Sequence, residues 1–265
     1  TYMDNGYVYV SKKKISNFDG KGRGKVDMQK VIDDSLNTGA VFIEQSLGRE
    51  MFSSYFKAFG LGEKTEIDLP NEVSGLIDNL DSKYDVDQAT AAFGQGIALS
   101  PMEIIRALGA IANGGYLIRP SVTDSIRYDS GVVKTIEPLV QGRAIKKETA
   151  QEVSRMLVRA YDEALLGGTL KLDGYSIAAK TGTAQIPKPG GGYYDDRTLH
   201  SFFGYFPAYN PRFLVFLYIN NPKGIKYANQ TLAVPFSEIA KFLIGYYDIP
   251  PDRYAGKNNM LKLSK

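Results

Sequence analysis

Lys180, Thr181, Gly182 and Thr183 place a cation, two hydroxyl groups and a glycine in one short run of the sequence. At the end of a strand, such a run offers free backbone groups on which an extended peptide can lie as an added strand. Gly182 would let a substrate backbone come close, and Lys180 is suited to a carboxylate. The run indicates a device for holding a peptide that ends in a carboxylate. The plain alternative is a strand with a glycine bulge and a surface lysine.

Ser35 and Asn37 form a second candidate group, at the expected end of a helix. An Asn amide can donate a hydrogen bond to a substrate carbonyl, and a Ser hydroxyl can relay a proton between a lysine and a leaving group. By themselves the two residues carry little weight, because helix ends favour both types for capping.

Two Ser-x-x-Lys patterns occur, at residues 11–14 (SKKK) and 54–57 (SYFK). In one large group of serine acyltransferases this spacing marks the nucleophile and the lysine that activates it. Ser11 sits in extended, lysine-rich sequence, where Lys14 would be solvated and protonated near pH 7, and so a poor base. Ser54 falls in an amphipathic helix.

The elements that must position these residues are of mixed type. Residues 7–15 predict a hairpin or an extended loop, and 63–88 read as mostly irregular. Helical spacing of apolar residues predicts helices from residue 27 to the Ser35 region and over about 40–47, 50–59, 101–111, 147–166 and 233–246. Strands are expected at 175–183, 199–206 and 213–220, with a Gly-, Pro- and Tyr-rich loop at 184–198. This order indicates an α/β (α+β) fold, with an antiparallel sheet flanked by helices and a helical region beside it.

Composition excludes several function classes. The chain has 265 residues, of which 43% are hydrophobic, and a net charge of +3, which suggests neither disorder nor a nucleic-acid partner. It has no cysteine and a single histidine, so we expect no disulfide, no metal site and no cofactor. His200 begins an expected strand, and a structural histidine is the more common reading of such a position than a catalytic one.

Five stretches of the sequence, two of which contain these short motifs, carry a wider pattern. They are SLNTG (35–39), FGLGEKTEIDLPNEVSG (59–75), FGQGIALSPMEIIRALGAIANGG (93–115), AAKTGTAQIP (178–187) and HSFFGYFPAYNP (200–211). Over nearly all of residues 4–247 the chain resembles the transpeptidase domain of a class B (monofunctional) penicillin-binding protein, most closely the septal cell-division type. The resemblance implies the transpeptidase fold shared with serine β-lactamases. β-Lactamases would match the short motifs but not the long stretches.

The resemblance also implies roles for the catalytic candidates. Ser35 would relay protons between the nucleophile's lysine and the leaving group, and Asn37 would bind the acyl-side amide of the substrate. Lys180 would raise the local positive potential and steady Ser35. The backbone N–H of Thr183 would form half of an oxyanion hole.

The substrate-binding candidates are implied in the same way. The hydroxyls of Thr181 and Thr183 would hold the terminal carboxylate of the substrate or of a β-lactam, and Gly182 would admit the substrate backbone. Gln185 and the loop through Tyr193 and Tyr194 would border the acceptor site.

The nucleophile is expected to be missing from this chain. In the family, the Ser-x-x-Lys lies at the N-terminus of a buried helix that precedes the Ser-x-Asn. Ser11 falls where the family has a surface hairpin, and Ser54 follows Ser35 in the wrong chain order. The chain opens at Thr1 without a signal-peptide pattern or an apolar run of 18 residues. We therefore interpret it as an excised piece, with a partial transpeptidase domain over 1–250 and a polar tail over 251–265.

The expected function is part of a serine-type peptidoglycan D,D-transpeptidase that acts on stem peptides ending in D-Ala-D-Ala and binds β-lactams. The parent protein would be anchored on the extracytoplasmic face of the bacterial membrane and work with a membrane glycosyltransferase and with division or elongation proteins. The fragment alone would be inactive. The alternative is a non-catalytic scaffold or binding protein of the cell-wall machinery that keeps the fold.

Overall fold

The computed structural model describes residues 1–253, which form two compact units. The first unit covers Thr1–Glu152 and the second begins at Val153. The polar tail expected over 251–265 lies outside the described residues from position 254 onward. Each unit is a separate body with its own buried residues.

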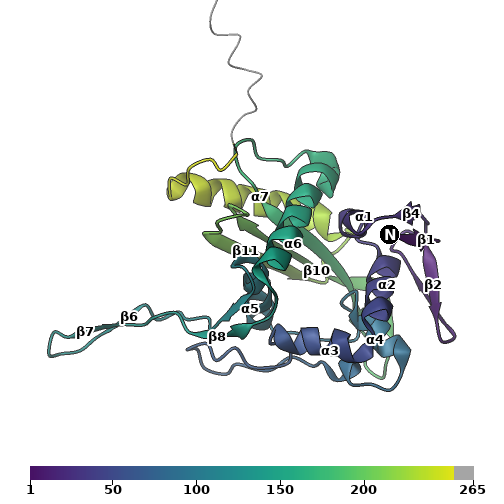
Figure 1. The fold of residues 1–265 in the computed structure, drawn as a ribbon, viewed down its shortest axis with the longest axis horizontal. Helices are drawn as coiled ribbons and strands as arrows, with labels where there is room; N and C mark the ends of the chain where they lie inside the picture. The colour runs from purple at the N-terminus through teal and green to yellow at the C-terminus, as the bar shows by residue number, and fades with distance from the viewer. Residues whose placement is uncertain (254–265) are drawn as a thin grey trace, which may run out of the picture. The chain divides into compact units, whose positions relative to one another are not determined.

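The first unit holds five α-helices among its described residues and one short 3-10 turn (Figure 1). The helices are α1 (Met28–Asp33), α2 (Asn37–Leu47), α3 (Arg49–Ala58), α4 (Asp85–Ala91) and α5 (Pro101–Ala112), and the turn is η1 (Asp78–Leu80). Small clusters of buried apolar residues join them. One of these clusters consists of Tyr2, Val31 and Leu36 and packs α1 against the start of α2.

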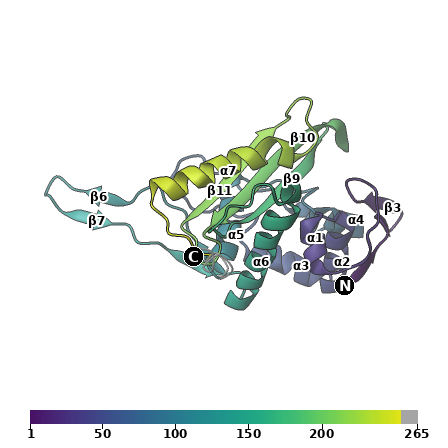
Figure 2. The ribbon, with the colours of Figure 1, turned by 90° about the horizontal axis from the view of Figure 1, so that it is seen from above.

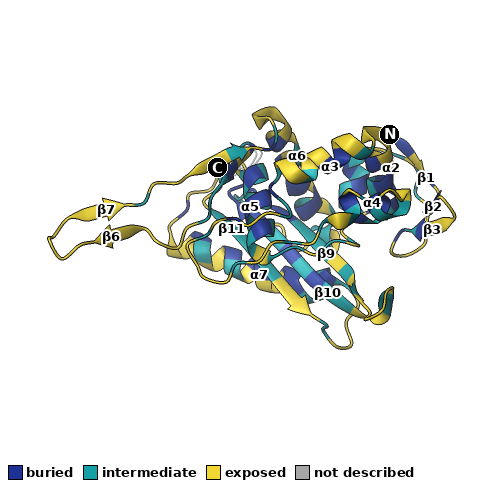
Figure 3. Ribbon diagram, turned by 90° about the horizontal axis from the view of Figure 1, so that it is seen from below, coloured by how far each residue is buried: buried dark blue, intermediate teal, exposed yellow. Residues whose placement is uncertain are grey.

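The first unit also has four two-stranded antiparallel sheets within its described residues. They are β1–β4 (Tyr2–Asp4 with Gly24–Val26), β2–β3 (Tyr7–Val10 with Lys13–Ser16), β5–β8 (Tyr116–Ile118 with Val140–Arg143) and β6–β7 (Ser125–Arg127 with Val133–Thr135). The β6–β7 ribbon extends from β5 and β8 and is exposed on both strands (Figure 3). The sequence-based hairpin over 7–15 is confirmed by β2 and β3.

The second unit is built on an antiparallel sheet in the order β11-β10-β9, with α7 packed on one face (Figure 2). Its strands are β9 (Ala178–Pro187), β10 (Tyr193–Phe206) and β11 (Phe213–Asn220), and its long helix is α7 (Ala228–Tyr246). Phe202 of β10 and Phe236 of α7 are fully buried and stack with ring centroids 4.5 Å apart. This aromatic core holds the sheet and helix together.

A helix that starts in the first unit leads into the second. It is α6 (Lys147–Arg159), followed by a π-helical turn η2 (Ala160–Ala164) and a 3-10 turn η3 (Leu165–Gly168). In the second unit, the buried Tyr205 hydroxyl lies 2.7 Å from Ser154 Oγ, which ties the end of α6 to β10. Burial raises the pKa of Tyr205 to about 12, so this phenol stays protonated and can serve as a hydrogen-bond donor.

Several boundaries differ from the sequence-based expectations. The loop expected at 184–198 is mostly strand, because β9 runs on to Pro187 and β10 starts at Tyr193. The last helix begins at Ala228 rather than near 233, and contains Pro235. Helix α4 lies in a stretch that was read as largely irregular. In each case pairing or packing with distant residues extends an element beyond its local signal.

Candidate functional site

Ser35 lies at the junction of α1 and α2 in a left-handed backbone conformation, with φ of 55°. The Ser35 N–H donates to Ile32 O at 3.3 Å and the Leu36 N–H to Val31 O at 3.0 Å, the two bonds of a Schellman motif. Leu36 then buries its side chain with Val31, which completes the motif. The left-handed position is usually taken by glycine, so a serine there is a strained residue of the kind that gathers at functional sites.

Asn37 is the first residue of α2 and is partly buried, whereas Ser35 is exposed. The Asn37 amide donates from Nδ2 to Ser16 O at 3.0 Å, and this bond fixes its side chain. An amide has two N–H donors and a carbonyl oxygen, so one such bond leaves capacity for a ligand. Gly39 allows this arrangement, because a Cβ there would lie 2.5 Å from a methyl group of Val31.

Lys180, Thr181, Gly182 and Thr183 lie on β9, the edge strand of the three-stranded sheet. In the sheet order β9 pairs with β10 on one side only, so half of its backbone groups point away from β10. Lys180 is half-buried, and its Nζ donates to Thr181 O at 3.1 Å. Gly182 faces Ser201 across the ladder, and a Cβ at this position would come within 2.5 Å of Ser201 Oγ.

The Thr183 side chain points to the start of α7. Its Oγ1 accepts a hydrogen bond from the Ala228 N–H at 3.0 Å. A hydroxyl that accepts can still donate its own proton, so this contact is compatible with the carboxylate-binding role expected for Thr183. The same bond links β9 to the start of α7, a structural role of Thr183 that the sequence does not predict.

His200 pairs with Thr183 on β10 and is fully buried. Its ring nitrogens lie 2.9 Å from Thr231 Oγ1, 3.0 Å from Thr198 Oγ1 and 3.1 Å from Lys226 O. Burial lowers the pKa of His200 below its ordinary value, although the bond to Lys226 acts in the opposite direction. These contacts support the structural reading of the histidine.

Gln185 lies further along β9 and is exposed. Its Nε2 donates to Tyr194 O on β10 at 3.2 Å. The Tyr194 ring is flanked by two cations, with the Arg197 guanidinium 4.1 Å and the Lys188 ammonium 5.6 Å from its centroid. Beyond Gly182, the contacts of Tyr194 with Gln185 and Lys188 help to hold β9 and β10 together.

The serines of both Ser-x-x-Lys patterns lie at exposed positions. Ser11 is exposed at the turn of the β2–β3 hairpin, and the Lys14 ammonium lies over the Tyr7 ring, 4.3 Å from its centroid. Ser54 is exposed on α3 and donates to Met51 O at 2.8 Å.

The lysine of the second pattern, Lys57, is ion-paired with Asp81 at 2.9 Å. Ser54 and Lys57 border a surface hollow of about 350 Å³, which includes neither Ser35 nor Asn37.

The predicted residues fall into two groups, one in each unit. Ser35 and Asn37 lie together in the first unit, while the β9 residues Lys180, Thr181, Gly182, Thr183 and Gln185 lie together in the second. The structure describes each group only within its own unit.

Sequence reasoning missed a cluster of polar side chains near the start of α2, which consists of Asp4, Asn17 and Thr38. Thr38 and Asp4 are joined by a hydrogen bond of 2.8 Å between residues 34 positions apart. In the sequence these three are polar residues far apart in the chain, and their types alone do not show that they bond to one another.

Two further features of residues 1–253 bear on chemistry and location. These residues contain no group of three or more His, Asp or Glu side chains placed to hold a metal ion. None of the helices described here combines the length and apolar character that a membrane span requires.

A family model described as the penicillin-binding protein transpeptidase domain matches residues 1–241. Stage V sporulation protein D of Bacillus subtilis is 33% identical over 237 residues, which cover 88% of this chain and 36% of that protein. Peptidoglycan D,D-transpeptidase FtsI of Buchnera aphidicola is 31% identical over 252 residues, covering 94% of this chain and 42% of that protein. The chain therefore spans less than half the length of these curated relatives.

Solved structures show the same likeness. Penicillin-binding protein 3 of Mycobacterium tuberculosis, complexed with ampicillin, superposes with a TM-score of 0.87 at 27% identity. The match covers 96% of this chain and 58% of that one. The transpeptidase domain of Burkholderia pseudomallei penicillin-binding protein 3 gives a TM-score of 0.81 at 26% identity, covering 95% of this chain and 73% of that chain.

Proposed function

Because the chain belongs to the penicillin-binding protein transpeptidase domain family, we propose that it supplies the Ser-x-Asn and Lys-Thr-Gly elements of a peptidoglycan D,D-transpeptidase. The observation that carries the proposal is the conformation of Ser35. Glycine would fill this left-handed position more easily, so a serine there, two residues before Asn37 on the first turn of α2, supports a role for its hydroxyl.

The reaction is acyl transfer through a serine ester. A serine hydroxyl attacks the carbonyl carbon of the penultimate D-Ala, the peptide C–N bond breaks, and D-Ala leaves with the proton. An amine of a second stem peptide then attacks the ester carbonyl, a new amide forms, and the serine recovers its proton. A β-lactam acylates the same serine by opening of its ring.

The residues of this chain act around that serine. Ser35 passes the proton to the leaving amine, and Asn37 donates its amide N–H to the carbonyl on the acyl side of the substrate. Lys180 adds positive charge near the terminal carboxylate, which the hydroxyls of Thr181 and Thr183 hold. The Thr183 N–H, on the edge strand, is one donor to the developing oxyanion.

The serine itself comes from outside residues 1–265. The only two Ser-x-x-Lys patterns lie on a hairpin turn and on an exposed helix face, and Lys57 is ion-paired rather than free to accept a proton. The complete protein works on the outer face of the bacterial cytoplasmic membrane, where peptidoglycan stem peptides are present. Its partners there are a membrane glycosyltransferase and division or elongation proteins.

Labelling by a fluorescent penicillin tests the proposal. The protein is prepared with an upstream segment that carries a Ser-x-x-Lys, and Lys180→Ala is compared with Lys241→Ala. Lys241 lies on α7 and is ion-paired with Glu238 at 2.8 Å. We expect Lys180→Ala to slow labelling by about a hundredfold or more, as loss of a preorganised electrostatic group does, and Lys241→Ala to leave it unchanged. Absence of labelling in the unmodified protein would instead favour a scaffold that keeps the fold.

A further inference from the structure

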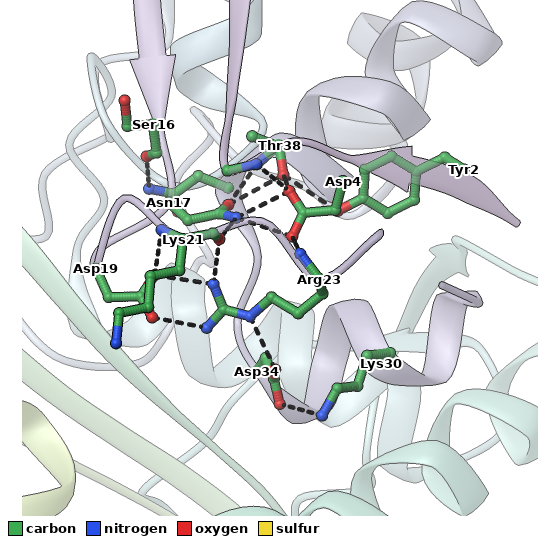
Figure 4. Close-up of polar contacts among 12 residues, drawn as sticks. Tyr2, Asp4, Ser16, Asn17, Asp19, Lys21, Arg23, Lys30, Asp34 and Thr38 are labelled. Atoms are coloured by element: carbon green, nitrogen blue, oxygen red, sulfur yellow. Dashed lines mark hydrogen bonds and ion pairs between the residues drawn. The ribbon is translucent and has the colours of Figure 1, made fainter. Parts of the chain in front are cut away.

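A buried carboxylate, Asp4, lies next to the start of α2 (Figure 4). It sits at the end of β1 and is 1% exposed. It accepts hydrogen bonds from Gly6 N at 2.9 Å, Arg23 N at 3.0 Å, Thr38 Oγ1 at 2.8 Å and Asn17 Nδ2 at 3.0 and 3.1 Å. These four donors are two backbone amides, a hydroxyl and a side-chain amide, all of them neutral.

The charge of Asp4 depends on these donors. Burial alone would raise the pKa of the carboxyl group, but the bonds from Gly6, Thr38, Asn17 and Arg23 outweigh it and lower the pKa below the ordinary value. A buried anion that loses donors is strongly destabilised. Asp4 therefore holds its donors in fixed positions.

Two of the donors lie beside the contacts of Asn37: Thr38 follows Asn37 in the chain, and Asn17 follows Ser16, which accepts from the Asn37 amide. The Thr38 N–H donates to Asn17 Oδ1 at 3.2 Å. Thr38 Oγ1 lies 2.8 Å from Asp4 Oδ1 and 3.0 Å from Asn17 Oδ1, within hydrogen-bond distance of both. Ser16 O, one residue before Asn17, accepts the bond from the Asn37 amide. Residues 16–17 thus contact both Asn37 and Thr38, and Asp4 anchors Asn17.

The other side of the junction is held through Arg23. Its backbone N–H binds Asp4, while its Nε donates to Asp34 Oδ2 at 3.2 Å, directly before Ser35. Lys30 Nζ also binds Asp34, at 2.9 Å. Residues 35–37, the Ser-x-Asn segment, are therefore held on both sides by groups that converge on one buried carboxylate.

We propose that Asp4 is a positioning residue for the transpeptidase reaction, which fixes the geometry of Asn37 and Ser35 through Asn17, Thr38 and Arg23. The inference rests on the proposed function. Small displacements of catalytic groups can slow a reaction by about a hundredfold, so a rigid support beneath a strained serine has a direct effect on rate. Asp4 itself touches no substrate.

The test compares two carboxylates of the first unit. Asp4→Asn replaces one acceptor oxygen with an NH2 donor that faces groups that all donate. Glu72→Gln makes the same chemical change at a carboxylate that accepts from the Thr65 and Glu66 N–H groups at 2.8 and 2.9 Å. In the form that carries an upstream Ser-x-x-Lys, we expect Asp4→Asn to lower the saturating penicillin-acylation rate about ten- to a hundredfold with little change in the half-saturating concentration. Glu72→Gln should leave the acylation rate intact.

Thr38 provides a second pair of variants if Asp4→Asn does not fold. Thr38→Val removes the hydroxyl with little change of shape and should slow acylation as Asp4→Asn does, and Thr38→Ser should restore the rate. Amide hydrogen exchange at residues 37–39 should be faster in Thr38→Val than in Glu72→Gln. Equal acylation rates in Asp4→Asn, Thr38→Val and Glu72→Gln would overturn the inference.

An unmodified protein that is never acylated would overturn the proposed function and, with it, the catalytic meaning of Asp4. The exchange comparison separates the two failures. Faster exchange at residues 37–39 in an unreactive protein would leave Asp4 as a support of the fold alone.

Discussion

Ser35 has a left-handed backbone conformation, which residues other than glycine seldom adopt. The left-handed conformation costs an L-residue about 1–2 kcal/mol, and glycine would adopt it freely. The Schellman bonds around it and the burial of Leu36 compensate for that cost. A residue whose conformation is unfavourable for stability but whose hydroxyl is needed for chemistry is typical of an active site.

Substitutions of Ser35 should affect stability and reactivity differently. Ser35→Gly and Ser35→Ala both remove the hydroxyl, so both should abolish penicillin acylation in the form that carries an upstream Ser-x-x-Lys. They differ only in backbone freedom, and we expect Ser35→Gly to be about 1 kcal/mol more stable than Ser35→Ala. Urea unfolding of the two variants measures the difference. Equal stability would mean that the left-handed conformation is not strained.

The lowered pKa of His200 should make the stability of the protein depend on pH. Its pKa in the folded protein lies below the ordinary value of 6.5, so between the two values the unfolded chain binds a proton that the folded chain does not. The free energy of unfolding should therefore fall as the pH drops below 6.5, by at most about 1.4 kcal/mol per pH unit, and the loss should end once folded His200 is also protonated. Because the chain has one histidine, His200→Gln should remove this slope. A slope that persists in the variant would assign it to the carboxylates.

At the scale of elements, the sheet of the second unit depends on close packing against α7. Gly204 of β10 lies beneath the Phe236 ring, where a Cβ would come within 2.3 Å of a ring carbon and 3.0 Å of the Ala179 Cβ. The ring is fully buried and cannot move outward without opening the core. The same β10 carries His200, which binds Thr231 of α7. Strand and helix are thus fitted to each other along their length.

Gly204→Ala should therefore destabilise the protein by about 1–3 kcal/mol, as overpacking of a filled core does. Gly109→Ala is the matched control. It lies inside α5 with open space around its missing Cβ, and the exchange should stabilise the helix by about 0.5–1 kcal/mol. Thermal or urea unfolding of both variants checks the pair. A neutral Gly204→Ala would show that Phe236 can repack.

How far the elements follow from sequence depends on the range of the interactions. The start of α5 was predictable, because Ser100, Pro101 and Glu103 form a local capping box that the structure contains. The same Glu103 carboxylate also accepts from the Gly62 and Gly75 N–H groups, each at 2.9 Å. No local sequence pattern predicts those two bonds. For the same reason the length of β9 was underestimated, since only pairing with β10 extends it.

The candidate site divides in the same way. The residue types and spacing at 35–37 and 180–185 suffice to suggest carboxylate binding and proton transfer. The hydrogen bonds next to residues 35–37 cannot be predicted from the sequence, because Asp4, Asn17 and Thr38 meet only after β1, β3 and α2 have folded together. The Ala228 contact of Thr183 likewise depends on where α7 begins.

At the scale of the whole molecule, the chain consists of two units, and each carries one group of the candidate residues. The first holds Ser35 and Asn37, the second the Lys180–Thr183 run, and the match to the family model extends over 1–241. The curated relatives are more than twice as long. We propose that these residues serve a serine outside them, and that Ser11 and Ser54 are not nucleophiles.

Intact-mass spectrometry after incubation with a penicillin tests this claim most directly. We expect no adduct on residues 1–265 alone, and one adduct once an upstream Ser-x-x-Lys segment is present. That adduct should map to the upstream serine, persist in Ser11→Ala and Ser54→Ala, and be lost or strongly slowed in Lys180→Ala. A stable adduct on the 265-residue chain, mapped to Ser11 or Ser54, would contradict the account.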